Sequence, residues 1–236
     1  MTSRPTPPAP LVIAHRGASG SELENSLAAF QAAAPQGADG VELDVHATAD
    51  GELIVHHDES VGHTPIPRAT ARAITALRLS NGEPVPTLSQ ALAAIAPRLQ
   101  VFIEVKSLPP RWDERLFEIL DRGPNPAGYA VHSFDHRIVR RLGEKRPSLP
   151  RGVLMGAYPV RPLSAMEDAG ASILWQEQSL ADEMLVHTVQ RAGARIFVWT
   201  VDEPGDLARF VAWGVDGICT NLPARARQAV DAPRAA

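Results

Sequence analysis

The sequence contains a single cysteine, Cys219, so no disulfide can form within the chain. Cysteine and histidine also do not occur together at the spacing that is typical of structural zinc sites. The one cysteine stands in the apolar stretch GICT, which predicts a buried thiol. Stability must therefore come from a hydrophobic core, and 236 residues are enough to bury a large one.

Long apolar runs and an excess of positive charge are also missing. No stretch approaches the roughly 20 apolar residues that a membrane-spanning helix needs, so we expect no stable membrane insertion. The first ten residues contain four prolines and no apolar segment, which is typical of a disordered tail and not of a signal peptide. We therefore expect a cytoplasmic protein. The net charge of −4 argues against nucleic acid as a partner, although a local cluster of cations can still bind a small anion.

The chain does contain a regular alternation of short apolar runs and amphipathic stretches. Runs that are apolar on successive positions predict eight strands, at 11–14, 40–45, 99–105, 129–133, 152–155, 172–175, 195–200 and 216–220. Helical patterns are found at 26–36, 87–96, 113–123, 181–194 and 203–214. Alternating strands and helices predict parallel strands, and eight units in this length favour an α/β fold of the (β/α)8 TIM-barrel type. A doubly wound open sheet is the competing architecture.

No domain boundary interrupts this pattern. We expect a disordered tail at 1–10, a single domain at 11–225 and a C-terminal tail at 226–236. A small insertion follows the second strand, at about 47–86, where the rhythm breaks. The turn pair Asp50-Gly51 and the run ELIVHH predict a strand hairpinned to the second strand, and the proline-rich remainder predicts a loop above one end of the sheet.

Three acidic side chains stand at the ends of predicted strands, where function gathers in such folds. Glu42 and Asp44 are two residues apart, so they point to the same face of one strand. Glu104 and Lys106 repeat this geometry on the next barrel strand. Three carboxylates together form an oxygen-rich site that suits Mg²⁺, Ca²⁺ or Mn²⁺ better than zinc. The alternative is that these acids form salt bridges with Arg16 and Lys106 at a solvated rim.

Two histidines, His15 and His57, also stand at strand ends. A pair of histidines that faces one site can act as general base and general acid near neutral pH. Arg16 and Lys106 suit an anionic substrate group, since arginine offers a bidentate fork for phosphate. The glycines of HRGASG match no nucleotide-binding loop, and Gly17 instead predicts a tight turn. No catalytic role is predicted for the remaining histidines, which are His46, His56, His63, His132, His136 and His187.

The order of these motifs resembles the glycerophosphodiester phosphodiesterase family. The motifs are HRG at 15–17, EN at 24–25, ELD at 42–44, HHD at 56–58 and IEVK at 103–106. WTVD at 199–202 and DGICTNLP at 216–223 are similar to the last two strands of that family, so the resemblance extends from Val12 to Pro223. Two departures stand out: LENS where the family often has PENT, and HDESVGHTPI without the arginine that often follows the second histidine. The second departure concerns how the insertion selects substrates.

The resemblance implies a (β/α)8 barrel with a small insertion after the second strand, and a set of roles for individual residues. It implies one divalent cation, Mg²⁺ or Ca²⁺, held by the carboxylates of Glu42, Asp44 and Glu104. It further implies that His15 and His57 form an acid/base pair. The implied pocket for the phosphate and the rest of the substrate consists of Arg16, Lys106, Glu24, Asn25 and Trp199.

The activity implied is metal-dependent hydrolysis of a small glycerophosphodiester to sn-glycerol 3-phosphate and an alcohol. The reaction would pass through a cyclic phosphate, with one histidine as base and the other as acid. Three alternatives are a lysophospholipase D-like enzyme, a phosphodiesterase that stops at the cyclic product, and a non-catalytic barrel that binds phosphorylated ligands. Headgroup preference, physiological metal and oligomeric state are not predicted by the sequence.

Overall fold

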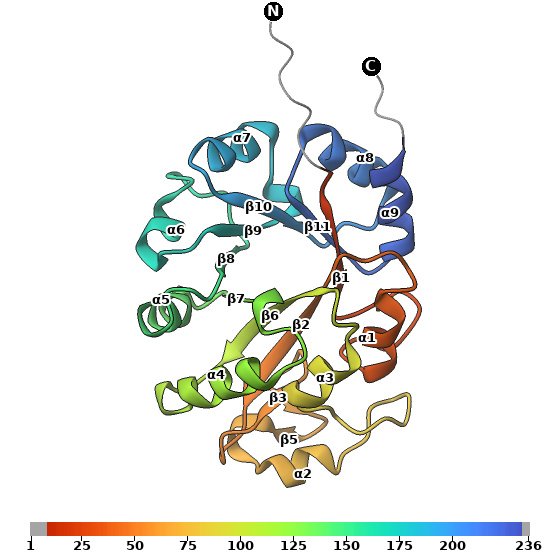
Figure 1. Cartoon of the computed structure of the whole chain (residues 1–236), viewed down its shortest axis with the longest axis vertical. Coiled ribbons are helices and arrows are strands. Elements are labelled where there is room, and N and C mark those ends of the chain that lie inside the picture. Colours follow the sequence, from red (N-terminus) through yellow and green to blue (C-terminus); the bar gives the residue numbers. More distant parts are fainter. Residues whose placement is uncertain (1–8, 233–236) are drawn as a thin grey trace, which may run out of the picture.

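Eight parallel strands close into a barrel in the computed structural model, which describes residues 9–232 (Figure 1). They are β1 (Leu11–His15), β2 (Gly40–Ala47), β6 (Gln100–Ser107), β7 (Tyr129–Ser133), β8 (Arg151–Met155), β9 (Ile173–Glu177), β10 (Arg195–Trp199) and β11 (Gly217–Thr220). Closure occurs at β1, where Ala14 lies opposite Thr220 of β11 and Val41 of β2. The predicted (β/α)8 barrel is therefore confirmed, and the open doubly wound sheet is wrong.

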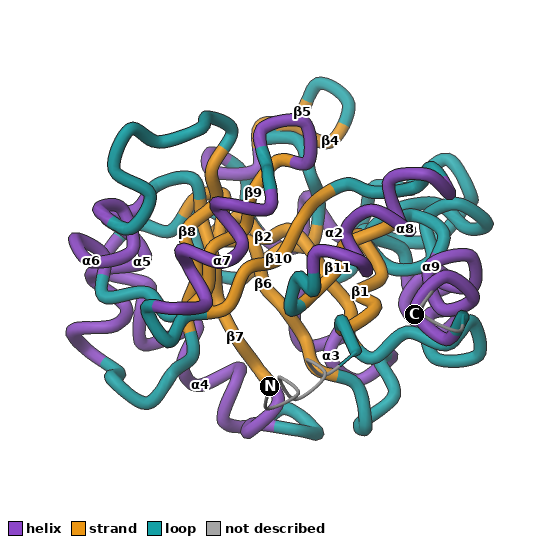
Figure 2. The backbone as a smooth tube through the Cα atoms, turned by 90° about the horizontal axis from the view of Figure 1, so that it is seen from above, coloured by secondary structure: helices purple, strands orange, loops and turns teal. Residues whose placement is uncertain are grey.

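Helices surround these strands, as the view from above shows (Figure 2). They are α1 (Leu27–Ala33), α2 (Ala71–Thr75), α3 (Leu88–Ala94), α4 (Asp113–Arg122), α5 (His136–Lys145), α6 (Ser164–Ala169), α7 (Glu183–Arg191), α8 (Pro204–Trp213) and α9 (Pro223–Asp231). Ser26 caps α1, and Thr87 and Gln90 form a capping box at α3. Among the described residues, no helix has both the length and the apolar character that crossing a membrane requires.

Aromatic side chains fill the inside of the barrel below the carboxyl ends of the strands. Phe102, Trp175 and Phe197 meet edge to face, with ring centroids 5.0–5.4 Å apart. The predicted burial of Cys219 is confirmed, since it belongs to the same cluster and is 1% exposed. This apolar cluster closes the barrel interior below the carboxyl ends of the strands. Polar side chains that lie nearer those ends therefore have a region of low dielectric, the apolar cluster, on one side.

The insertion after β2 folds around a small core of its own. Its first strand, β3 (Leu53–Val55), runs antiparallel to β2 as predicted, with Val55 opposite Val45. The expected proline-rich loop contains the short strands β4 (Ser60–Val61) and β5 (Thr64–Pro65) and the helix α2. A satellite apolar cluster packs beneath them: Ile54, Val61, Ile66, Ile74 and Val85. The insertion forms the lower end of the molecule in Figure 1, away from α7 and α8.

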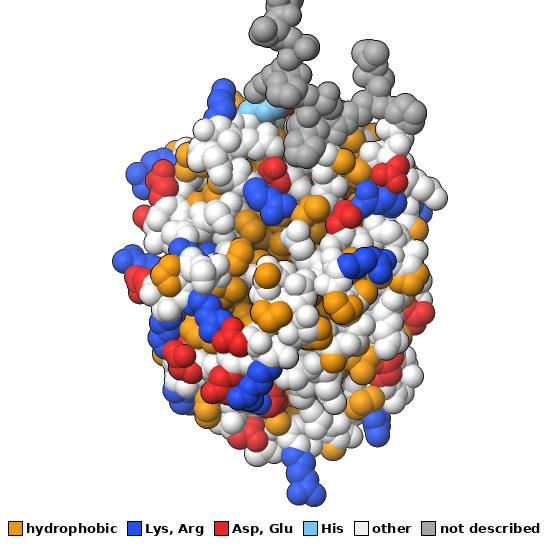
Figure 3. Space-filling view, in the orientation of Figure 1, with side chains coloured by type: hydrophobic (Ala, Val, Ile, Leu, Met, Phe, Trp, Pro, Cys, Tyr) orange, Lys and Arg blue, Asp and Glu red, His pale blue; other side chains and the backbone are white. Residues whose placement is uncertain are grey.

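The C-terminal segment differs from the tail expected at 226–236. Helix α9 continues to Asp231 and buries Ala226 and Val230 against the barrel. Residues 1–8 of the expected N-terminal tail and residues 233–236 lie outside the described residues. Across the described part of the face in Figure 3, acidic and basic side chains are interspersed, as the small net charge leads us to expect.

Candidate active site

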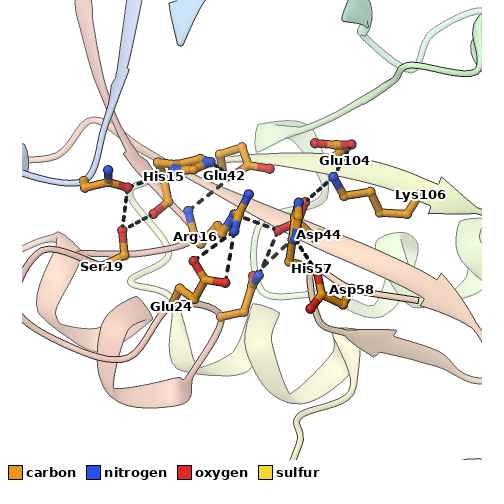
Figure 4. A network of polar contacts seen from close by, with 12 residues as sticks. His15, Arg16, Ser19, Glu24, Glu42, Asp44, His57, Asp58, Glu104 and Lys106 are labelled. Carbon is orange, nitrogen blue, oxygen red and sulfur yellow. Dashed lines mark hydrogen bonds and ion pairs between the residues drawn. The ribbon is translucent and has the colours of Figure 1, made fainter. Parts of the chain in front are cut away.

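The carboxyl ends of the barrel strands enclose one pocket that collects most of the predicted site residues. Its lining consists of His15, Arg16, Glu42, His57, Glu104, Lys106, His132, Phe134, Leu154, Trp175, Trp199 and Cys219. Three predicted residues do not line the pocket but contact residues that do, as Figure 4 shows for two of them. They are Glu24, Asn25 and Asp44, and Asn25 makes its contact through a backbone hydrogen bond to Arg16.

The chain leaves β1 through a left-handed turn that opens the pocket. Arg16 has φ +55° and Gly17 has φ +84°, so the predicted turn at Gly17 is confirmed. A Cβ at Gly17 would lie 2.6 Å from the carbonyl carbon of Ala29, which only glycine avoids. The Arg16 amide donates a 3.1 Å hydrogen bond to Oε2 of Glu42 and so holds its own strained backbone in place. The Arg16 guanidinium reaches both oxygens of Glu24, at 3.0 and 2.9 Å.

Asp44 is buried between two cations. Its carboxylate lies 3.2 Å from Arg16 Nε and 3.2 Å from Lys106 Nζ, and it accepts a 2.8 Å hydrogen bond from the Asn25 amide. Burial raises the pKa of Asp44, but Lys106 and Arg16 lower it more, so the net pKa falls below its ordinary value. The alternative of salt bridges with Arg16 and Lys106 is therefore confirmed for this acid, but the solvated rim is wrong, because the Asp44 side chain is 1% exposed.

The other two carboxylates, Glu42 and Glu104, are buried with less compensation. Burial and then repulsion from Asp44 raise the pKa of Glu42 well above its ordinary value and raise that of Glu104 to about 7. Lys106 Nζ lies 2.7 Å from Glu104, whereas Oε1 of Glu42 is buried without a hydrogen-bond partner among the described residues. Buried carboxylates that repel one another and keep unpartnered oxygens fit a hard divalent cation.

His132, for which the sequence predicted no role, lies against these carboxylates. In the register of the barrel, His132 of β7 lies opposite Glu104 of β6. The ring of His132 stacks on Trp175, with the ring centroids 4.2 Å apart. Its Nε2 is 3.9 Å from Oε1 of Glu42. Glu42, Glu104 and His132 can each present one ligand atom within 4.8 Å of the others, which makes them a possible metal site. The available signal was the position of His132 at a strand end.

His15 is held by a chain of hydrogen bonds that reaches across the closure of the barrel. Its Nδ1 lies 2.8 Å from Oδ1 of Asn221, and the Asn221 amide donates to Asp202 at 2.6 Å. Because a carboxylate only accepts, the Asn221 oxygen must face His15 and accept its Nδ1–H. Nε2 of a neutral His15 is then free of a proton and lies 4.0 Å from Oε2 of Glu42. Burial and then Arg16 lower the pKa of His15, which favours the neutral ring.

Asn221 and Asp202 are functional candidates that the residue-by-residue reading of the sequence missed. Both stand in motifs that were noticed only as similar to the last two strands of a family, WTVD and DGICTNLP. Their relation to His15 depends on β11 lying beside β1, which a linear pattern does not reveal.

His57 occupies a more open corner, on the insertion side of the pocket. Its side chain is 38% exposed, and its Nδ1 lies 2.8 Å from the Asp58 carboxylate. His46 donates from Nε2 to the His57 carbonyl at 3.1 Å, which ties the loop to β2. In Figure 4, His57 lies beside Asp44, and Asp58 extends away from the carboxylate cluster. The two histidines thus reach the pocket from different elements and with different exposure.

An apolar wall completes the pocket opposite the charged residues. Phe134 and Trp199 meet edge to face at 5.7 Å, and Leu154 and Trp175 continue the wall. Phe134 is 50% exposed, so the wall extends to the surface. A phosphate bound between Arg16 and Lys106 would therefore have charged groups on one side and aromatic rings on the other.

Comparisons with known proteins show which family the chain is similar to. Residues 15–225 match the model of the glycerophosphoryl diester phosphodiesterase family. A glycerophosphodiester phosphodiesterase from Caldanaerobacter subterraneus subsp. tengcongensis is 34% identical over 229 residues, covering 90% of this chain and 94% of that protein. The crystal structure of a glycerophosphodiester phosphodiesterase from Parabacteroides distasonis superimposes with a TM-score of 0.84 at 27% identity, over 95% of this chain and 98% of that one.

A phosphodiesterase from Oleispira antarctica, solved in complex with the product sn-glycerol-3-phosphate, has the same fold. Its TM-score is 0.88 at 24% identity, covering 95% of this chain and 98% of the other. The family model matches nearly the whole barrel, and one relative is more than 30% identical. The assignment of the chain to a family therefore rests on its sequence as well as on its fold. The chain belongs to the glycerophosphoryl diester phosphodiesterase family and is a hydrolase of glycerol phosphodiesters.

Proposed function

We propose that the chain hydrolyses glycerophosphodiesters to sn-glycerol 3-phosphate and an alcohol, with a divalent cation and through a cyclic phosphate. The observation that carries the proposal is the composition of one pocket. Two histidines, His15 and His57, reach it together with two cations, Arg16 and Lys106, above buried carboxylates. Cationic side chains recognise the anionic diester, and paired histidines supply the proton transfers that both steps need.

The hydrogen bonds of the two histidines suggest how they divide the work. Asn221 holds the Nδ1–H of His15, so the free Nε2 can take the proton of the glycerol 2-hydroxyl as that oxygen attacks phosphorus. Asp58 accepts the Nδ1–H of His57 and so orients the ring, whose Nε2 can give a proton to the departing alcohol. In the second step His57 takes a proton from the attacking water, and His15 returns its proton to the 2-oxygen.

The carboxylates Glu42, Asp44 and Glu104 are the proposed holders of the cation, Mg²⁺, Ca²⁺ or Mn²⁺. Oε1 of Glu42, which lacks a hydrogen-bond partner in the described part of the chain, supports this assignment. When bound, the cation supplies positive charge that neutralises the phosphate and lowers the pKa of the glycerol 2-hydroxyl. Asn25 orients Asp44 through its 2.8 Å hydrogen bond.

The rest of the proposed pocket orients the substrate. Glu24 keeps the Arg16 guanidinium in place through two hydrogen bonds. Arg16 and Lys106 then stabilise the charge that builds up on the phosphate oxygens in the transition state, which is the largest expected contribution to rate. Trp199, at the mouth of the apolar wall, contacts the part of the substrate beyond the phosphate.

A second candidate substrate class, lysophospholipids, is favoured by the position of exposed apolar side chains. The exposed large apolar residues of the described chain all follow the carboxyl ends of β7, β8 or β9, on the side of the barrel that holds the pocket. They are Phe134, Tyr158, Val160, Leu180 and Met184. Such a rim can accept an acyl chain, and an enzyme with this preference would release the headgroup as a lysophospholipase D does.

An activity screen tests both candidates. Glycerophosphocholine, glycerophosphoethanolamine and lysophosphatidylcholine are incubated with the full chain after EDTA treatment, and then with Mg²⁺, Ca²⁺ or Mn²⁺ restored. Phosphorus NMR separates sn-glycerol 3-phosphate, a cyclic phosphate and lysophosphatidic acid. We expect metal-dependent sn-glycerol 3-phosphate from the soluble diesters. Undiminished turnover in EDTA, or accumulation of the cyclic product alone, would contradict the proposed reaction.

A further inference from the structure

We propose that His132 supplies a nitrogen ligand to the divalent cation, beside Glu42 and Glu104. The inference rests on the proposed function, since it needs a cation at these carboxylates. It adds a ligand that the acidic motifs do not contain, because His132 comes from β7 and the acids from β2 and β6. A nitrogen donor changes which metals the site prefers, and this consequence can be measured without turnover.

The separation of the ligand atoms carries the proposal. Nε2 of His132 is 3.9 Å from Oε1 of Glu42, which is too long for a hydrogen bond. Two atoms that each lie about 2.1 Å from one ion can be no more than about 4.2 Å apart, so the distance fits two ligands of a single cation. The ligand atoms of Glu42, Glu104 and His132 all lie within 4.8 Å of one another, so the three side chains are close enough to hold one metal ion.

No hydrogen bond within the described part of the chain explains the place of His132. The ring is 2% exposed, and the described residues form no hydrogen bond with it, while Nδ1 is buried without a partner. A buried imidazole without a hydrogen bond is costly, whereas an apolar residue would fill this space at no such cost. Oε1 of Glu42, which lies 3.9 Å from Nε2 of His132, is likewise unpartnered. A shared cation would satisfy both atoms at once.

Trp175 prepares the ring for this role. The His132 and Trp175 planes are 10° from parallel at a centroid distance of 4.2 Å, so stacking limits rotation of the imidazole. Trp175 is itself 1% exposed and is held by Phe102 and Phe197. The ring is therefore oriented before any cation arrives, which lowers the entropy cost of binding.

A mixed nitrogen and oxygen ligand set predicts a metal preference. Ca²⁺ and Mg²⁺ prefer oxygen ligands alone, whereas Mn²⁺ and the later divalent metals accept imidazole. We therefore expect the chain to bind Mn²⁺ more tightly than Mg²⁺. Replacing His132 with an oxygen donor should reduce this difference, because the affinity for Mn²⁺ falls more than the affinity for Mg²⁺.

The test uses Mn²⁺ alone as the probe, on the full metal-free chain. Pulsed electron paramagnetic resonance of bound Mn²⁺ reports directly on nitrogen ligands, and titration gives its affinity. We expect a ¹⁴N coupling in the wild type that changes to ¹⁵N when histidine is ¹⁵N-labelled. In His132→Gln the coupling should disappear and the Mn²⁺ dissociation constant should rise about tenfold or more, since loss of even an outer-sphere partner costs that much.

Two further variants identify the nitrogen. His15→Gln must keep the coupling, because His15 is the other histidine near Glu42. His136→Gln is the matched control outside the pocket. The His136 ring donates a hydrogen bond to the Leu154 carbonyl and does not belong to the lining of the active-site pocket. If His132→Gln does not fold, ¹⁵N-histidine labelling of the double variant His15→Gln/His57→Gln still decides the point, because His132 is then the one histidine left in the lining of the pocket. That sample must show the ¹⁵N coupling with an unchanged Mn²⁺ affinity.

The outcomes separate the inference from the function on which it rests. Bound Mn²⁺ without histidine coupling, or coupling that persists in a folded His132→Gln, would overturn the nitrogen ligand and leave the metal-dependent reaction intact. A wild-type chain that binds no divalent cation would overturn the proposed metal dependence, and the inference with it.

Discussion

The two halves of the pocket wall differ sharply in chemistry. β1, β2 and β6 and the segments that follow them contribute both cations, two of the buried carboxylates and both proposed proton carriers. β7 to β11 and the residues after them contribute aromatic and aliphatic side chains and the thiol of Cys219, with His132 as the charged or strongly polar exception. The first half carries the groups that can bind a phosphate and a metal cation. The second half is apolar, like a hydrophobic core, and extends to the surface.

The contrast shows that the apolar half acts on the charged half. Burial is the largest cause of the raised pKa of both Glu42 and Glu104, and the apolar wall and the apolar cluster inside the barrel help provide that burial. A low dielectric on one side strengthens the interactions of Arg16 and Lys106 with a bound phosphate. The charged half therefore performs the proposed chemistry in an environment that the apolar half creates.

The largest expected effect comes from breaking the charged half at its proton carriers. His15→Ala and His57→Ala should each lower turnover of glycerophosphocholine by about 10²- to 10⁴-fold, which is the usual contribution of a general acid or base. Choline release measures the rate, and circular dichroism verifies the fold. His63→Ala, on the insertion but not in the pocket lining, is the matched control. Near-wild-type activity in either pocket variant would contradict the assignment.

A smaller loss is expected when the hydrogen-bond chain behind His15 is cut. Asn221→Leu removes the acceptor for the Nδ1–H, so the ring can adopt the wrong tautomer, and kcat should fall about tenfold or more. The limb of the pH–rate profile that reports His15 should shift as well, which a purely structural role would not cause.

Ser19→Ala is the control for this chain. It removes a hydroxyl 2.8 Å from the same Asn221 oxygen but leaves the acceptor for His15 in place. The proposed positioning role fails if Asn221→Leu and Ser19→Ala have equal effects on kcat and on the pH profile.

Breaking the apolar half should affect binding more than chemistry. Phe134→Ala removes part of the wall, and a loss of about 1–2 kcal/mol of apolar contact should raise KM roughly 5- to 30-fold with little change in kcat. The increase should be larger for lysophosphatidylcholine than for glycerophosphocholine, because the acyl chain buries more area. Phe134→Leu keeps most of that area and should stay close to wild type. An equal fall in kcat for both substrates would contradict this prediction, because it would mean that Phe134 affects the chemical step and not substrate binding.

The smallest effect concerns the stability of the metal-free chain. The pKa of Glu104 is about 7 in the folded state and near 4.5 when exposed, so the folded chain binds more protons between these values. Stability should therefore fall as pH rises from about 5 to about 7, and each 1 kcal/mol corresponds to roughly 2–4 °C in melting temperature for a chain of this size. Thermal melts in EDTA measure the slope. Glu104→Gln should flatten it, the exposed Glu144→Gln should not, and an unchanged slope in Glu104→Gln would contradict the prediction.

Much of the fold was predictable because barrel strands are buried on both faces. Runs such as 11–14 and 196–199 are apolar without interruption, and their alternation with helical patterns allows few architectures. Helix α5 was missed although Ile138, Val139 and Leu142 line one face, because basic residues between them obscure the pattern. The compact core of the insertion was also missed, because its apolar residues are scattered among prolines and turns.

The sequence by itself determined which elements form and which motifs stand at strand ends, because periodicity and strand pleat are local properties of the chain. The sequence therefore identified His15, Glu42 and Glu104 as candidate active-site residues. Only the tertiary structure decided that Asn221, 206 positions away, holds His15, and that His132 lies against Glu42. Those contacts depend on barrel closure between β1 and β11 and on the packing of β7 beside β6, which join segments that are distant in the chain.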